Sequence, residues 1–90
     1  TGATGFVGRY LLHEIFDTSD VDVHCAVRAA TQEEGLHRIK SSLNEYGLWK
    51  ESYESRIHVV LSDLAKEHLG IEDEAYKALC SQTDKIYHCA

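Results

Sequence analysis

The sequence predicts an α/β protein in which helices alternate with the strands of a parallel sheet, and three observations support this. The chain opens with the glycine-rich segment TGATGFVG, its apolar residues recur at helical and at strand spacing in turn, and each strand-like run is separated from the next by a helix-like run. Strands separated by helices are joined by crossovers that produce a parallel sheet with helices on its faces. We expect one domain over residues 1–90, without an internal boundary.

The opening segment places Gly2, Gly5 and Gly8 three residues apart. Its first gap is one residue wider than in the dinucleotide fingerprint, where glycines allow a tight turn, close approach of the backbone to a pyrophosphate and close helix packing. The N-terminus of the next helix would then face the anion. Because this fingerprint follows a strand, we expect a strand before Thr1. The chain would be the amino-terminal part of a Rossmann-like, doubly wound parallel sheet whose first strand is missing.

The first half of the chain contains three expected elements. Apolar residues at helical spacing from Val7 to Phe16 predict a helix that ends at the polar break 17–20. Residues 21–29 alternate β-branched with polar side chains, which is typical of a strand. A second helix follows within residues 31–49, where Thr31 and Glu34 are spaced as a capping box and Gly47 is a stop signal.

The second half continues the alternation. Residues 56–64 are apolar and rich in β-branched side chains, which predicts a second strand. Residues 72–83 predict a short helix, and residues 84–90 begin a third strand. The expected order is therefore helix, strand, helix, strand, helix, strand.

Composition excludes several classes of protein. The net charge of −6 and the pI near 5.4 argue against a nucleic-acid or anionic-membrane surface, because both partners need a basic field. No apolar run is long enough to span a bilayer. The three cysteines, Cys25, Cys80 and Cys89, are an odd number without metal-ligand spacing. We expect reduced, buried thiols in a cytoplasmic protein, and no metal site.

The residues after the glycine segment address the choice of nucleotide. NAD-binding sheets carry an acidic residue about twenty positions after the glycines, which accepts hydrogen bonds from the ribose 2′-hydroxyl. Arg28 stands at that place, twenty residues after Gly8, and a guanidinium offers donors to a 2′-phosphate instead. Arg38 would add positive charge to the same pocket. The expected cofactor is NADP, and Asp63, at the end of the second strand, could accept from the adenine amino group.

Five segments together resemble one family: TGATGFVG, VRA at 27–29, GLHRIKSSLNEYGLW at 35–49, SDL at 62–64 and DKIYHCA at 84–90. They are similar to the thioester reductase domains of extended short-chain dehydrogenase type, which end nonribosomal peptide synthetases, carboxylic acid reductases and aminoadipate reductases. The resemblance covers the whole chain but only the amino-terminal quarter of such a domain. It implies an oxidoreductase that uses NADPH to reduce a thioester, held on the phosphopantetheine of an acyl or peptidyl carrier domain, to an aldehyde or alcohol.

The resemblance also assigns roles to residues. A pyrophosphate-binding loop would comprise Gly2, Thr4, Gly5, Phe6, Val7 and Gly8. A second group, Arg28 and Arg38, would bind the 2′-phosphate, and Asp63 with Leu64 would flank the adenine. The chain departs from the usual sequence of this family at Cys89, where relatives usually have asparagine. The catalytic Ser or Thr and the Tyr-x-x-x-Lys pair of the family are expected after Ala90, so no catalytic residue is assigned to this chain.

Several patterns are interpreted as structural. Tyr46 and Lys50 match Tyr-x-x-x-Lys by spacing, but Gly47 separates them, so we expect a core tyrosine and a solvated lysine. His24–Cys25 and His88–Cys89 are adjacent residues on expected strands and point to opposite faces, which argues against a shared ion or nucleophile. Trp49 is expected to pack after a helix end.

Three alternatives to a thioester reductase remain at this point. A fatty acyl-CoA reductase is the nearest of them. A sugar-nucleotide epimerase or dehydratase shares the fold but typically has an acidic residue where Arg28 stands. A nucleotide-binding module without chemistry is the third.

Overall fold

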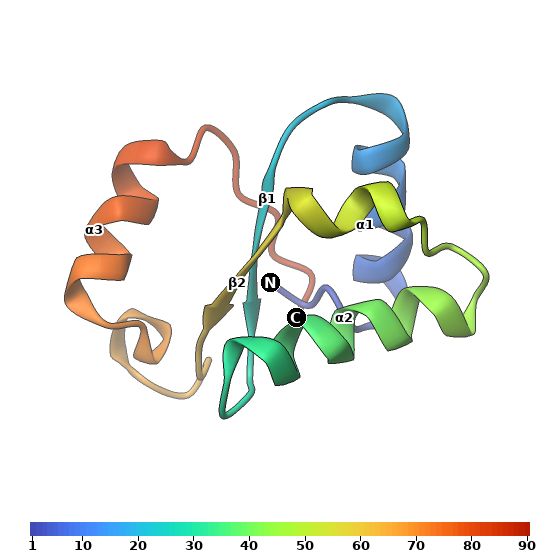
Figure 1. Ribbon diagram of the computed structural model, residues 1–90. Helices are drawn as coiled ribbons and strands as arrows, with labels where there is room; N and C mark the ends of the chain where they lie inside the picture. The colour runs from blue at the N-terminus through green and yellow to red at the C-terminus, as the bar shows by residue number, and fades with distance from the viewer.

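The computed structural model describes residues 1–90 and confirms the alternation of helices and strands over most of the chain (Figure 1). The elements in order are α1 (Phe6–Thr18), β1 (Val23–Val27), α2 (Gln32–Glu45), the 3-10 helix η1 (Glu51–Arg56), β2 (Ile57–Leu61), the 3-10 helix η2 (Glu67–Gly70) and α3 (Asp73–Gln82). Neither 3-10 helix was expected from the sequence. No helix has the length and apolar character that a membrane crossing needs.

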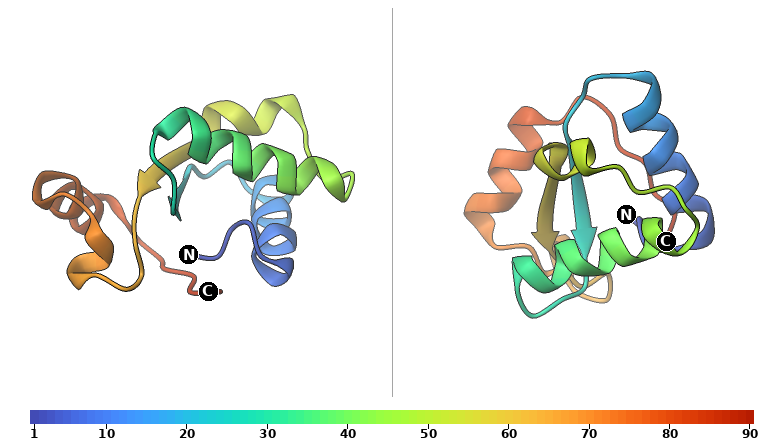
Figure 2. Two further views of the ribbon diagram at one scale, coloured as in Figure 1. Left: turned by 90° about the horizontal axis from the view of Figure 1, so that it is seen from below. Right: turned by 45° about the vertical axis from the view of Figure 1, so that its right-hand side comes forward.

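The sheet consists of β1 and β2, which pair in parallel with Val23 opposite Ile57 and Val27 opposite Leu61. Figure 2 shows α1 and α2 on one side of the strands and α3 on the other side of β2, away from α1. Gly35 lets α2 approach the sheet, because a Cβ at this position would lie 2.6 Å from a methyl group of Val59. The parallel pairing with an intervening helix confirms the predicted α/β class.

The core lies between the strands and the first two helices. Its eight buried residues come from α1, β1, α2, η1 and β2: Leu12, Phe16, Cys25, Val27, Ile39, Leu43, Tyr53 and Ile57. The two members from α1 and the two from α2 are each four residues apart, a spacing that places side chains on one helix face. Helix α3 contributes no buried residue. The packing therefore fixes α1 and α2 against β1 and β2, which sets the position of the loops that leave the strands.

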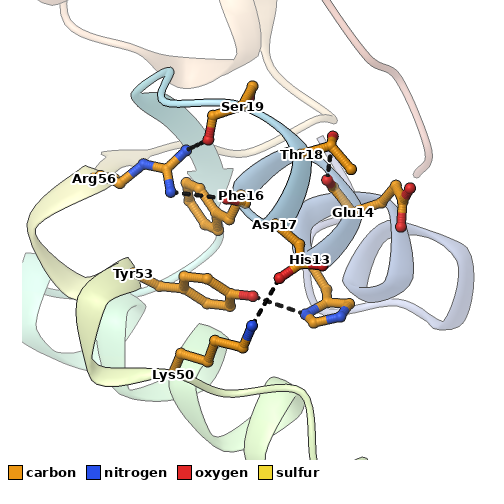
Figure 3. A network of polar contacts seen from close by, with 9 residues as sticks. All are labelled: His13, Glu14, Phe16, Asp17, Thr18, Ser19, Lys50, Tyr53 and Arg56. Atoms are coloured by element: carbon orange, nitrogen blue, oxygen red, sulfur yellow. Dashed lines mark hydrogen bonds and ion pairs between the residues drawn. The ribbon is translucent and has the colours of Figure 1, made fainter.

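Arg56 ties the end of α1 to the start of β2 (Figure 3). Its guanidinium donates to the carbonyl oxygens of Phe16 at 2.9 Å, Ser19 at 2.5 Å and Val21 at 3.0 Å. These carbonyls at and beyond the helix end would otherwise lack donors. The α1 helix consequently continues to Thr18, into the polar segment where the sequence predicted its end.

The second helix forms as predicted. The Thr31 hydroxyl accepts from the amide of Glu34 at 3.1 Å, while the Glu34 carboxylate accepts from the amide of Ala30 at 3.2 Å. Gly47 has a φ of 69°, in the left-handed region that ends helices.

The predicted third strand is wrong for this chain, because residues 84–90 have no regular secondary structure and belong to no sheet. Their partner is a single residue. The amino group of Thr1 donates to the Tyr87 carbonyl at 2.8 Å, and the Cys89 amide donates to the Thr1 carbonyl at 3.2 Å. This is the slanted pattern of a parallel ladder, limited to one position. The strand-like composition of the segment is not sufficient without a neighbouring strand over its length.

Candidate functional site: a dinucleotide-binding cleft

The glycine loop runs from Gly2 to the first turn of α1. Gly2 has a φ of 74°, and the Gly5 amide donates to its carbonyl at 3.0 Å, which closes a tight turn. A Cβ on Gly2 would lie 2.6 Å from the backbone carbon of Cys89. Both the turn and the close approach of the last residues therefore need a glycine here.

Gly8 has the packing role expected of the third glycine. It is buried in α1, and a Cβ there would lie 1.8 Å from the Gly2 carbonyl oxygen. The helix therefore rests directly on the loop, and α1 positions the loop through backbone contact.

The N-terminus of α1 presents free hydrogen-bond donors. Gly5 is its N-cap, which has no side chain to accept from them. No hydrogen bond of the chain involves the amides of Phe6, Val7 and Gly8. The side chains of Phe6 and Val7 are 67% and 65% exposed. Unpaired amides at a helix N-terminus, together with the helix dipole, form a binding place for an anion.

A cleft of about 350 Å³ lies at the carboxyl ends of β1 and β2. It brings together six residues that the sequence assigns to cofactor binding: Gly2, Thr4, Arg28, Arg38, Asp63 and Leu64. The other four residues of that assignment do not line it and continue from the loop into α1: Gly5, Phe6, Val7 and Gly8. Ligands of open α/β sheets bind in crevices of this kind, outside the carboxyl ends of the strands.

Two arginines supply the positive charge of the cleft. Arg28 follows β1 directly and is exposed, and Arg38 reaches it from the first half of α2. A guanidinium nitrogen of Arg38 donates to the carbonyl of Arg28, so the helix and the strand end are joined at this point. Neither guanidinium makes any other hydrogen bond or ion pair in the chain, and both residues line the cleft. This is a suitable environment for a phosphate.

Asp63 and Leu64, which follow β2, also line the cleft. One carboxylate oxygen of Asp63 accepts from the amide of Ala65 at 3.0 Å, so this residue caps the turn after β2. Leu64 is 49% exposed and presents an apolar surface beside it. The second Asp63 oxygen is left without a hydrogen-bond donor in the chain.

These features fit a dinucleotide. The unpaired amides of α1 match a pyrophosphate, Gly2 and Gly8 let the loop pack closely against the last residues and α1, and the arginines supply donors at the end of β1. The NAD-binding family model described as "Male sterility protein" matches residues 1–90, which is the whole chain. The chain belongs to this family. The match to a family of this kind indicates binding of a nicotinamide dinucleotide.

Among curated members with similar sequences are multienzyme proteins and reductases. The chain is 44% identical over 88 residues to a linear gramicidin synthase protein of Brevibacillus parabrevis, covering 98% of this chain and 2% of that protein. It is 39% identical over 89 residues to the L-2-aminoadipate reductase of Schizosaccharomyces pombe, covering 98% of this chain and 6% of that protein. The resemblance to terminal reductase domains that the sequence suggested is confirmed.

Solved structures agree. The terminal R domain from the myxalamid PKS-NRPS biosynthetic pathway has a TM-score of 0.92 and 39% identity, with 98% of this chain and 23% of that chain covered. The PhqB reductase domain from Penicillium fellutanum has a TM-score of 0.90 and 36% identity, with 99% and 25% covered. The chain thus spans about a quarter of these domains. Its similarity to their structures confirms the predicted Rossmann-like fold class.

The Tyr46–Lys50 pair does not form a unit in this member of the male sterility protein family. Tyr46 lies at the end of α2 and is 43% exposed. The Arg9 guanidinium lies over its ring, with 4.1 Å between the guanidinium carbon and the ring centroid. The expectation of a core tyrosine was therefore wrong. Lys50 forms an ion pair of 2.7 Å with Asp17 (Figure 3), which raises the pKa of Lys50 and lowers the pKa of Asp17.

The histidines and cysteines behave as separate structural groups. Cys25 is buried, and burial raises the pKa of its thiol to about 11. Cys80 is exposed and Cys89 half-buried, so the expectation of buried thiols holds only for Cys25. His24 points to the opposite, exposed face and stacks on His58 at 4.8 Å, where partial burial and this neighbour lower the pKa of His24. No three potential ligands come together as a metal site.

Trp49 packs as expected. It is half-buried, meets Tyr53 edge to face at 6.1 Å and donates to Glu51 at 2.9 Å.

Sequence reasoning missed Arg9. This residue follows Gly8, and its guanidinium lies against the glycine loop, donating to the carbonyls of Thr4 and Gly5. The sequence did contain a signal, namely a cation in the first turn of a helix. Such a charge is unfavourable next to the positive end of the helix dipole, so a specific contact is expected to stabilise it.

Proposed function

We propose that this chain is the NADP-binding part of a reductase that acts on acyl or aminoacyl thioesters held by a carrier domain. The observation that carries the choice of NADP is the pair Arg28 and Arg38, joined through the Arg28 carbonyl at the end of β1. An NAD-specific site has a carboxylate in this region to accept from the ribose hydroxyls, whereas two guanidinium groups suit a 2′-phosphate.

The remaining assigned residues take the roles that their surroundings favour. The amides of Phe6, Val7 and Gly8 bind the pyrophosphate, approached over the loop residues Gly2, Thr4 and Gly5. The free oxygen of Asp63 accepts from the adenine amino group, and Leu64 packs against the ring. NADPH, when bound, supplies the hydride. No residue of this chain is assigned to contact the reacting carbonyl, so its own contribution is binding and orientation.

The substrate class is supported by the relatives. The linear gramicidin synthase protein and the terminal R domain of the myxalamid pathway belong to assembly-line enzymes by name, and aminoadipate reductase reduces an acid. We infer for this protein a phosphopantetheine thioester on a carrier domain as the substrate form, and an aldehyde or alcohol as the product. Three unpaired cysteines are consistent with action in the reducing cytoplasm.

The test uses the full-length protein with a carrier domain loaded with an acyl thioester. We expect NADPH to be oxidised in step with aldehyde or alcohol formation, and NADH to support a much lower rate. The matched control is the same acyl group as a free acid. Oxidation of NADPH with the acid alone, or with acyl-CoA in preference to the carrier thioester, would contradict the proposed substrate. Tight NADPH binding without any turnover would favour a non-catalytic module.

A further inference from the structure

Arg9 is an arginine with an unusual position in the first turn of α1. Its side chain is only 12% exposed and lies between the glycine loop and the C-terminal end of α2. The guanidinium covers the ring of Tyr46, at 4.1 Å from the centroid. Its only carboxylate neighbour, Glu45, is 4.0 Å away and 72% exposed, so the charge of Arg9 is weakly compensated.

The donors of Arg9 are directed at the loop. Its Nε donates to the Gly5 carbonyl at 3.1 Å, and one terminal nitrogen donates to the Thr4 carbonyl at 3.2 Å. The hydroxyl of Ser42, from α2, donates to the same Thr4 oxygen at 3.2 Å. The Thr4 carbonyl is therefore held by side chains of α1 and α2, and the Gly5 carbonyl by both the side chain and the backbone amide of Arg9. The other terminal nitrogen of Arg9 is buried and makes no hydrogen bond.

The peptide plane explains why this matters. In a trans peptide the carbonyl of one residue and the amide of the next point in opposite directions. The Gly5 oxygen accepts from the backbone amide of Arg9 at 3.0 Å and from its side-chain Nε at 3.1 Å, so the Phe6 N–H of the same plane points the other way, and this amide has no acceptor in the chain. If that plane rotated, a carbonyl oxygen would replace the N–H donor on the side offered to the anion. An oxygen there would repel a pyrophosphate.

We propose that Arg9, stacked on Tyr46, is a positioning residue that keeps the loop carbonyls turned toward α2 and the unpaired amides turned toward the pyrophosphate. It acts through the peptide planes and does not itself contact the dinucleotide. This inference rests on the proposed function, since it concerns how the same site binds NADPH.

The test compares two ligands of the full-length protein by calorimetric titration. NADPH contains the pyrophosphate, whereas adenosine 2′-monophosphate has the adenine, the ribose and the 2′-phosphate alone. Arg9→Lys keeps the charge but loses the planar fork that bonds two carbonyls. We expect it to weaken NADPH by about tenfold and to leave the monophosphate within about threefold. Tyr46→Leu removes the stacking surface and should show the same split with a smaller loss.

Arg56→Lys is the matched control, because Arg56 holds three carbonyls at the other end of the same helix. It should lower the melting temperature without separating the two ligands. Equal losses for both ligands in Arg9→Lys, the same split in Arg56→Lys, or unchanged NADPH affinity in Arg9→Lys would overturn the inference. A wild-type protein that binds NADPH no better than the monophosphate would instead contradict the proposed function.

Discussion

Gly8→Ala is expected to damage folding and cofactor binding together, because α1 rests on the glycine loop at this residue. The added Cβ would lie 1.8 Å from the Gly2 carbonyl oxygen. Real Cβ atoms essentially never approach another heavy atom closer than 3.0 Å, so helix and loop must separate by about 1.2 Å. Overpacking of this kind costs about 1–3 kcal/mol. For a domain of ordinary size this lowers the melting temperature by roughly 2–12 °C.

The loss in binding follows from the same displacement. Moving α1 lengthens the hydrogen bonds from its amides to the pyrophosphate, and losing one or two such bonds at about 1.5 kcal/mol each lowers NADPH affinity by about ten- to a hundredfold. Thermal melts and NADPH titration of the full-length protein measure the two effects separately.

Gly47→Ala is the matched control for Gly8→Ala. Gly47 has a φ of 69°, and a Cβ there would meet nothing within 4 Å. The cost is the left-handed conformation alone, about 1–2 kcal/mol, since the added Cβ contacts no part of the loop. Gly47→Ala should therefore lower the melting temperature while NADPH affinity stays within about threefold. Wild-type stability and affinity in Gly8→Ala would refute the packing argument, as would equal binding losses in the two variants.

Three further outcomes are expected. The pKa of His24 is lowered from 6.5 in the folded chain, so the unfolded chain binds this proton first as the pH drops. The free energy of unfolding therefore falls from about pH 7 down through the folded pKa. In pH-dependent melts His24→Asn should lose less stability than the wild type over that range, and equal losses would contradict the assignment. Cys25, with its pKa of about 11, should resist alkylation at pH 8 in the native protein and react only on unfolding, as mass spectrometry would show. Tyr46→Phe retains the ring under Arg9, so turnover should stay within a few fold; a collapse by orders of magnitude would make its hydroxyl a proton donor.

Local signals were sufficient for much of the fold. The α2 helix was predictable because its limits are set by its own residues, the cap at Thr31 and the stop at Gly47. Strand β1 was predictable because its side chains alternate between β-branched and polar, and β2 because its residues form an apolar run rich in β-branched side chains. The end of α1 was not, because Arg56, forty residues after Phe16, supplies donors that no local pattern contains.

Residues 84–90 show the limit of composition as a guide. Their side chains suit a strand, but a strand exists only where a neighbour pairs along its length, and here the partner is Thr1 alone. Tyr46 was misjudged for a similar reason. Its spacing after Leu43 suggested the core, whereas the contact that decides its position is the Arg9 guanidinium from another helix.

The residues that line the cleft were more predictable from the sequence than Arg9, which holds the glycine loop. Arg28 and Asp63 were identified because parallel strands bring their carboxyl ends to one edge, and both line the cleft at that edge. Arg9 was not identified because its function concerns the direction of backbone carbonyls, which side-chain patterns do not report.

Selection of NADP by the arginines at the end of β1 can be measured by titrating NADPH and NADH against the wild-type protein and Arg28→Ala. Charge-assisted hydrogen bonds contribute about 1.5–3 kcal/mol, so NADPH should weaken by roughly ten- to a hundredfold in the variant. NADH should be nearly unaffected, and the wild-type protein should prefer NADPH. Equal losses for the two nucleotides, or a wild-type preference for NADH, would contradict the account.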